Sequence, residues 1–328
     1  MGLHFYTTSP SSPKQQKARL GPSLALLRRQ IPFVVFGEEA LSIVHRVPTG
    51  FFDLHLLVPD AKLAEAASAI CSDCSYYLST TDDDRSWREM RMLSSKKEHA
   101  FNLNEDSLLL IHNSPKEFQE AHAALLVRHS NGIFMHKQSV FHFDLNDKLS
   151  VMLNPEPPAP EFAEVRFPRL NSFVDSAVAT QLDPPLGRHN TSLFGTLQTW
   201  MTYVLLYAVP GHGHPLDKNK RPKPGVLELL AQLKAESQPT MIRRTLGLGA
   251  PPVEHAVLEW RDLRRERLVP MGIKDKPRNE MISIPPGIRA EPQPPRLTPL
   301  IRQTSNEGRP EIYWRTLPRY AKVFELLR

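Results

Sequence analysis

The sequence predicts an α+β fold, in which a mixed sheet flanked by helices is followed by a helical C-terminal part. Residues 33–60 read in order as strand, glycine turn, short helix, loop and second strand. Shorter apolar runs at 76–78, 108–111 and 140–145 read as further strands. Beyond a proline-rich connector at 154–160, two apolar segments have the length of helices. Strands followed by helices are typical of the α+β class.

The first elements follow from local signals. Residues 24–30 read as a short helix that leads into the strand at 33–37, and residues 38–46 follow the glycine as a helix. After the second strand at 53–58, apolar residues at helical spacing indicate a helix over 61–71, and Asp60 is placed to cap it. The two later helices are expected at 171–181 and 190–209, where the aromatic side chains should lie in the core.

The second strand carries an unusual polar pair. Asp53 and His55 are two residues apart, so their side chains should point to the same face of the strand. The neighbouring residues Leu54, Leu56 and Val58 should pack inward. We therefore expect Asp53 and His55 to face one accessible cleft beside the Gly37 turn.

Residues 33–60 resemble the signature of the nucleotidyltransferase superfamily, which includes DNA polymerase beta and the aminoglycoside nucleotidyltransferases. In that signature an apolar strand ends in Gly-Gly or Gly-Ser, and Asp-hydrophobic-Asp/Glu follows after a short helix. Here Val34–Phe36 matches the strand and Gly37 the first glycine, while Glu38 replaces the second small residue. Asp53 matches the first carboxylate and His55 stands at the second. The resemblance extends to a fungal-type group with an acidic helix after the glycine.

The resemblance implies a nucleotidyltransferase-like sheet and, if the protein is active, a divalent metal held by Asp53 and His55. Gly37 and Glu38 would then lie at the phosphates. Histidine is a poor ligand for Mg²⁺, which prefers carboxylate oxygens. Glu38 and Glu39 suit the first turn of a helix but would repel a triphosphate there. These departures favour a degenerate site, for which no cofactor is expected.

A third catalytic carboxylate would come from a later strand. Asp144 is the candidate, at the end of the predicted strand 140–145. The alternative is that Asp144 forms a turn, which is the commoner role of an acid at a strand end.

The C-terminal part is rich in proline and basic residues. Helical spacing places Arg261, Arg264 and Arg265 on one side of a helix, which could contact nucleic-acid phosphates. Acidic residues are interleaved with them, so a solvated, mixed-charge face is the preferred interpretation. The predicted organisation is a disordered leader at 1–20, a nucleotidyltransferase-like domain at 21–160, a helical extension at 161–210 and this basic region at 211–328.

Composition sets further limits. The 328 residues are 41% hydrophobic, carry a net charge of +6 and contain no apolar run long enough to span a membrane. Cys71 and Cys74 form an isolated Cys-x-x-Cys that lacks a partner motif, so we expect them to be reduced. The first 37 residues contain five basic residues and no acid. A cytoplasmic protein is expected, while a mitochondrial or nuclear destination stays open.

Two functions follow from the residues and the resemblance. The first is a catalytically degenerate protein that acts in binding or interaction. The second is a divergent, active, metal-dependent nucleotidyltransferase that uses Asp53, His55 and Asp144.

Overall fold

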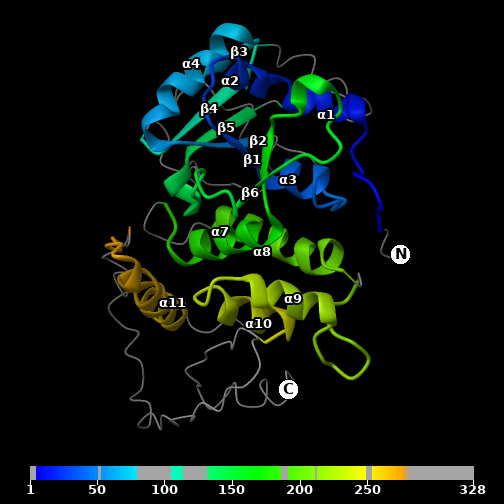
Figure 1. Cartoon of the computed structure of the whole chain (residues 1–328), viewed down its shortest axis with the longest axis vertical. Coiled ribbons are helices and arrows are strands. Elements are labelled where there is room, and N and C mark those ends of the chain that lie inside the picture. Colours follow the sequence, from blue (N-terminus) through cyan, green and yellow to red (C-terminus); the bar gives the residue numbers. More distant parts are fainter. Residues whose placement is uncertain are drawn as a thin grey trace.

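The computed structural model describes residues 5–50, 53–79, 105–113, 130, 132–185, 191–210, 213–248, 253–276 and 278. Within these ranges a sheet lies between helices, and a second group of helices lies beyond it (Figure 1). The strands are β1 Val34–Phe36, β2 Leu54–Val58, β3 Tyr76–Leu78, β4 Ser107–His112, β5 Gly132–Lys137, β6 Val151–Leu153 and β7 Arg166–Pro168. The α-helices are α1 Pro13–Leu20, α2 Leu24–Arg28, α3 Gly37–Ile43, α4 Leu63–Asp73, α7 Leu170–Leu182, α8 Thr191–Tyr203, α9 Pro224–Gln232, α10 Gln238–Thr245 and α11 Val253–Leu268.

The main sheet is mixed. Its described strands have the order β1-β2-β5-β4-β3, and only β2 and β5 pair in parallel. The strands β6 and β7 form a separate antiparallel ribbon, and β7 also contacts β1. Because β2 lies between β1 and β5, all five of its residues are buried. Polar side chains on β2 therefore lie in the core, whichever face of the sheet they point to.

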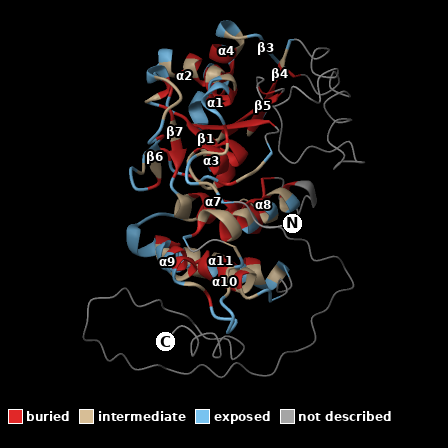
Figure 2. Cartoon of the chain, turned by 90° about the vertical axis from the view of Figure 1, so that its right-hand side faces the viewer, coloured by how far each residue is buried: buried red, intermediate tan, exposed pale blue. Residues whose placement is uncertain are grey.

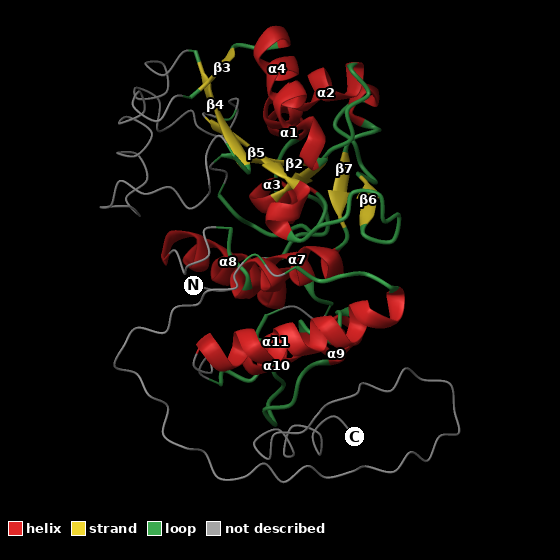
Figure 3. Ribbon diagram, turned by 90° about the vertical axis from the view of Figure 1, so that its left-hand side faces the viewer, coloured by secondary structure: helices red, strands yellow, loops and turns green. Residues whose placement is uncertain are grey.

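Helices cover both faces of the sheet. In Figure 3, α2 and α4 lie on one side of the strands, and α3, α7 and α8 lie on the other. Buried residues are concentrated in the sheet and in the helix faces that contact it (Figure 2). Phe36 of β1 stacks on Phe173 of α7, with ring centroids 4.7 Å apart, and meets Trp200 of α8 edge to face at 6.0 Å. These aromatic contacts fix α7 and α8 against the sheet.

The predicted α+β class is confirmed, with a mixed five-stranded sheet and a helical C-terminal part. β1 and β2 are adjacent and antiparallel, as expected, and α3 lies between them in the chain. α2, β3, β4 and α7 also correspond to predicted elements, while the predicted helix 190–209 is divided into α8 and a π-helical turn at Val204–Ala208. α4 begins later than expected, after a 3₁₀ turn at Asp60–Lys62, so Asp60 does not cap it.

Two expectations were wrong. The predicted strand 140–145 is a 3₁₀ turn at Gln138–Phe141 followed by left-handed His142, and the sheet is completed instead by β5. Part of the predicted disordered leader is helical, because Pro13–Leu20 forms α1. Ser12 caps that helix by accepting a hydrogen bond from the Gln15 amide. The other domain limits stay predictions, and residues 279–328 lie outside the described part of the chain.

Two remaining expectations concern cysteines and membrane spans. The thiols of Cys71 and Cys74 are free and partly buried, and burial raises the pKa of each. No helix within the described ranges combines the length and apolarity that crossing a membrane requires.

A buried carboxylate joins α7 to the helices beyond it. Both oxygens of Asp175 accept hydrogen bonds from the Lys234 amide, at 3.0 and 3.3 Å, at the turn between α9 and α10. Burial, opposed by the Lys234 charge, raises the pKa of Asp175 to about 6. Ionisation of Asp175 is therefore less favourable in the folded protein than in the unfolded chain, although the carboxyl group is still mostly ionised at pH 7.

The first prediction concerns Asp175. Because its folded pKa lies above its unfolded value of 3.8, the folded state binds more protons between these values, and its stability rises as the pH falls through about 6. From pH 7.5 to 5, wild type should gain about 1–2 kcal/mol relative to Asp175→Asn. Urea unfolding at both pH values measures this difference. An equal response of both proteins would show that Asp175 is not the titrating group.

Candidate functional site

The Gly37 turn connects β1 to α3. Gly37 has φ +70°, in the left-handed region, so the chain turns sharply where the apolar strand ends. The space above this turn is filled. A β-carbon on residue 37 would lie 3.1 Å from His55 Cδ2 and 3.2 Å from the Trp200 ring. A phosphate group would need this same space to reach the start of α3.

The second prediction follows from this packing. Gly37→Ala should lower the free energy of unfolding by about 2–3 kcal/mol, because alanine is strained at this φ and meets two buried rings. Gly195→Ala on α8 is the matched control, since nothing lies within 4 Å of its added β-carbon. The control should leave the free energy of unfolding unchanged or raise it, because alanine has a higher helix propensity than glycine. Equal urea midpoints for the two variants would contradict the crowded turn.

His55 points into the core. Only 4% of its surface is exposed, and its ring stacks against Phe134 and meets Trp200 edge to face. Its Nδ1 lies 3.1 Å from His136 Nε2, and His136 Nδ1 lies 2.7 Å from Ser107 Oγ. Side chains from β2, β5 and β4 thus form one buried polar chain. Burial lowers the pKa of His136 to about 3, so this ring is neutral at physiological pH.

Asp53 is also buried, with 3% of its surface exposed. It precedes β2, and its Oδ1 would lie only 2.8 Å from a β-carbon on residue 132, so Gly132 leaves room for the carboxylate. The expectation that Asp53 and His55 face an accessible cleft was wrong. The physical reason is that α3 packs against β2 and that Trp200 of α8 lies against His55.

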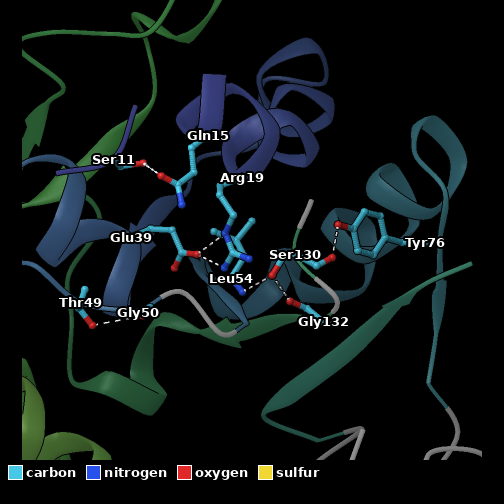
Figure 4. A network of polar contacts seen from close by, with 10 residues as sticks. All are labelled: Ser11, Gln15, Arg19, Glu39, Thr49, Gly50, Leu54, Tyr76, Ser130 and Gly132. Atoms are coloured by element: carbon cyan, nitrogen blue, oxygen red, sulfur yellow. Dashed lines mark hydrogen bonds and ion pairs between the residues drawn. The ribbon is translucent and has the colours of Figure 1, made fainter. Parts of the chain in front are cut away.

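A buried ion pair joins α1 to α3. Arg19 of α1 donates from Nε to Glu39 Oε1 at 2.9 Å, and its Nη2 pairs with the same oxygen (Figure 4). Neither side chain is more than 6% exposed. Burial raises the pKa of Glu39, Arg19 opposes this, and the charge of Asp53 raises it further. Asp53 and Arg19 also act on the pKa of Tyr76, whose hydroxyl donates to the Ser130 carbonyl at 2.6 Å.

Glu38 and Glu39 both lie in the first turn of α3, as predicted, and both are buried. Their position suits the helix dipole. It does not form a phosphate cradle, because Trp200 covers Gly37 and Arg19 engages Glu39. The phosphate role expected for Gly37 and Glu38 therefore has no support in the packing.

Asp144 does not join this site. It is exposed in the turn after the 3₁₀ segment, and its Oδ1 accepts from the Asn146 amide at 2.9 Å. The prediction of a strand-borne catalytic carboxylate was wrong, because the sheet strand ends at Lys137. The turn-forming alternative for Asp144 is confirmed.

The residues present do not fit a divalent metal held by Asp53 and His55. Nδ1 of His55 already contacts His136, and the ring is enclosed by aromatic side chains. Within the described ranges, no three His, Cys, Asp or Glu side chains are grouped to hold a metal ion.

The basic helix predicted near the C-terminus is α11. Arg264 pairs with Asp275 at 3.2 Å and donates to His142 Nδ1 at 2.9 Å. Arg267 pairs with Glu236 at 2.8 Å. The preferred interpretation of a fully solvated face was therefore incomplete, since these arginines hold α11 to the rest of the fold.

Sequence reasoning missed the residues that fill the site. These are Arg19, Glu39 as an ion-pair partner, Ser107 and His136. Trp200 was expected in the core, as it is, but not over the Gly37 turn. The run Gly-Ile-Phe-Met-His at 132–136 was a signal for β5, since apolar and aromatic residues follow a glycine there. No local signal pairs Arg19 with Glu39.

Comparison with known proteins gives only weak similarity. No family model matches the chain, and no curated protein matches it. A crystal structure of JHP933 from Helicobacter pylori is 12% identical, with a TM-score of 0.32 over 80% of this chain and 97% of that one. A putative nucleotidyltransferase from H. pylori is 11% identical, with a TM-score of 0.31 over 78% and 96%. At these values the similarity assigns no function.

Proposed function

We propose that this chain is a nucleotidyltransferase-like protein that has lost transferase activity and acts in binding or interaction. The observation that carries the proposal is the packing of Trp200 and His55 over the Gly37 turn. A triphosphate needs an open turn and a pair of carboxylates for Mg²⁺. Here the turn is covered, and the second carboxylate position holds a buried histidine. Membership of a fungal-type group of such proteins is part of the same proposal.

The third prediction tests this proposal. Purified protein should transfer no label from nucleoside triphosphates in the presence of Mg²⁺ or Mn²⁺. His55→Asp should not restore activity, because Trp200 still covers the turn and Glu39 still crowds the phosphate position. Incorporation that is present in wild type and abolished by Asp53→Ala would establish the active alternative instead. Asp262→Ala, at an exposed position on α11, is the matched control for that loss.

Contact with nucleic acid was the less favoured alternative for the basic C-terminal region. Not all arginines of α11 are available to bind phosphates, because Arg264 and Arg267 form ion pairs within the fold. Arg265 is exposed on the same helix. A single exposed arginine contributes little to binding that depends on the number of phosphates neutralised. We therefore favour an interaction that does not depend on phosphate contacts from α11.

A further inference from the structure

The loop between the π-helical turn and α9 is rich in cations. We refer to its described part, residues 213–223, as the basic loop; it contains four basic residues and one acid. In Figure 1 it projects from the group of helices beside α9. Lys218, Lys220 and Arg221 are exposed, and none of these three side chains forms an ion pair within the described part of the chain. The basic loop therefore presents cations that the fold itself does not neutralise.

We propose that the tip of the basic loop, residues 217–221, binds the phosphate backbone of nucleic acid without reading the base sequence. This contact names a partner for the binding role proposed above and rests on that role. A lysine ammonium offers three donors, and the arginine guanidinium offers a planar fork that fits a phosphate group. The exposed Asn219 adds an amide that can donate to phosphate or sugar oxygens.

Hydrogen bonds within the basic loop hold its tip in one shape. Oδ1 of Asp217 accepts from the amide of Asn219 at 2.8 Å and from the amide of Arg221 at 2.9 Å. The backbone of Asp217 also accepts from the Lys220 amide at 3.0 Å and donates to the Arg221 carbonyl at 2.8 Å. The acid of the basic loop thus closes the turn that carries the cations. A turn formed in advance loses less entropy when it binds a partner.

The base of the basic loop is fixed to the helices. The Gly213 amide donates to the Leu206 carbonyl of the π-helical turn at 2.8 Å. A β-carbon on residue 225, at the start of α9, would collide with the Pro210 carbonyl, so glycine at this position lets the two ends of the loop meet. The cations therefore stand on a support that α9 and the π-helical turn hold in place.

Lys220 has a strained backbone at the tip. Its φ is +60°, in the left-handed region, which glycine or asparagine adopts at a lower cost. Strain of this kind is found at functional positions, where a particular side chain is needed in a particular place. The strained backbone of Lys220 is therefore consistent with a role for its ammonium group at the tip.

The composition of the tip favours nucleic acid over a membrane or a protein. Residues 217–221 contain no apolar side chain. Binding at a bilayer surface depends on apolar side chains that enter it, and protein interfaces depend on buried aromatic or apolar anchors. The apolar residues Leu216 and Pro222 lie behind the tip, where they form an isolated β-bridge. Contacts with phosphates need only exposed cations and hydrogen-bond donors.

Fluorescence anisotropy with a labelled DNA duplex of about 20 base pairs tests the proposal on the full chain. Wild type should bind with a dissociation constant of about 1–100 µM, the range of sequence-independent binding, and the affinity should fall from about 50 to 200 mM salt. Lys218→Ala/Lys220→Ala/Arg221→Ala should reduce the slope of log K against log salt by about 2–3, because each lost phosphate contact removes about one unit.

The matched control removes the same charge from exposed positions outside the basic loop. Lys14→Ala/Lys17→Ala/Lys274→Ala should keep the slope of wild type. Both variants should keep its melting temperature, since every substituted side chain is exposed. Equal reductions of the slope in the two variants would overturn the proposal, because binding would then follow net charge alone. A wild type that does not bind the duplex would overturn it as well.

Asp217→Asn tests the tip without removing a cation. Asparagine keeps a side-chain oxygen for the two amides of the turn and removes the negative charge beside the cations. This variant should bind the duplex about threefold to tenfold more tightly than wild type at low salt. An unchanged or lower affinity would place the phosphates away from the tip and contradict the proposal.

Two further probes separate nucleic acid from other anionic partners. Phosphatidylserine vesicles and a polyglutamate peptide of about 20 residues offer negative charge without a phosphodiester backbone. Wild type should bind both more weakly than the duplex at the same salt concentration. Equal or tighter binding of either probe would overturn the choice of nucleic acid.

These results and those for the proposed function can fail separately. Transfer of label by wild type would refute the loss of activity without changing the salt slope of the loop variants. Absence of duplex binding would refute the phosphate contact and leave the absence of transfer intact.

Discussion

Trp200→Ala should lower the free energy of unfolding by about 3–5 kcal/mol, the usual cost of deleting a large buried aromatic side chain. The Trp200 ring is 2% exposed and contacts three parts of the core. It lies edge to face with Phe36 at 6.0 Å and with His55 at 5.8 Å, and it tilts against Phe173 at 5.7 Å. The substitution removes the contact between α8 and the sheet at the Gly37 turn.

Two measurements check this prediction. Urea unfolding should show the loss, and Trp200→Phe should show a smaller one because a ring remains. Indole added to Trp200→Ala should raise its melting temperature, because an apolar cavity of this kind binds an aromatic molecule. Wild type should not respond to indole. A loss below about 1 kcal/mol, or an indole effect on wild type, would contradict the packing of Trp200 over the turn.

The strand–turn–helix–strand unit could be predicted because its signals are local. The apolar run Val34–Phe36 ends at a glycine whose φ is positive, and Leu54–Val58 is continuously apolar. Burial on both faces of β2 was not visible in this pattern. An apolar strand with one polar pair reads as half-exposed, whereas parallel pairing with β5 places β2 inside the sheet.

The candidate site depended on contacts between distant residues, which a local pattern does not show. His55 contacts His136, which follows it by 81 positions. Arg19 precedes Glu39 by 20 positions and was assigned to a leader. Asp144 followed an apolar run that resembled a strand, but the backbone turns at left-handed His142. In each case tertiary packing overrode the local pattern.

The last prediction concerns two neutral histidines, the half-buried His45 and the fully buried His136. Burial lowers the pKa of His45 to about 4, and its Nε2 donates to the Pro168 carbonyl at 3.0 Å, which joins the end of α3 to β7. Burial lowers the pKa of His136 to about 3. Unfolding restores the pKa values of both histidines to the ordinary 6.5. Below that pH the unfolded chain therefore binds more protons than the folded protein.

These histidines change the folding stability with pH in the direction opposite to Asp175. A depressed histidine pKa contributes stability that is complete above pH 6.5 and is lost as the pH falls toward the folded pKa. From pH 7.5 to 5, each of these histidines should cost about 2 kcal/mol, against a gain of about 1–2 kcal/mol from Asp175. The histidine losses are therefore the larger contribution of these three groups.

His45→Gln isolates this effect, because glutamine can still donate to the Pro168 carbonyl but does not titrate. Between pH 7.5 and 5, wild type should lose about 2 kcal/mol more than this variant in urea unfolding. His255→Gln, at an exposed position on α11, should change with pH as wild type does. If His45→Gln also follows wild type, His45 titrates normally and is open to water in the folded protein. If only His45→Gln differs from wild type, the acid sensitivity arises at the contact between α3 and β7. The His45 ring is then neutral in the folded protein.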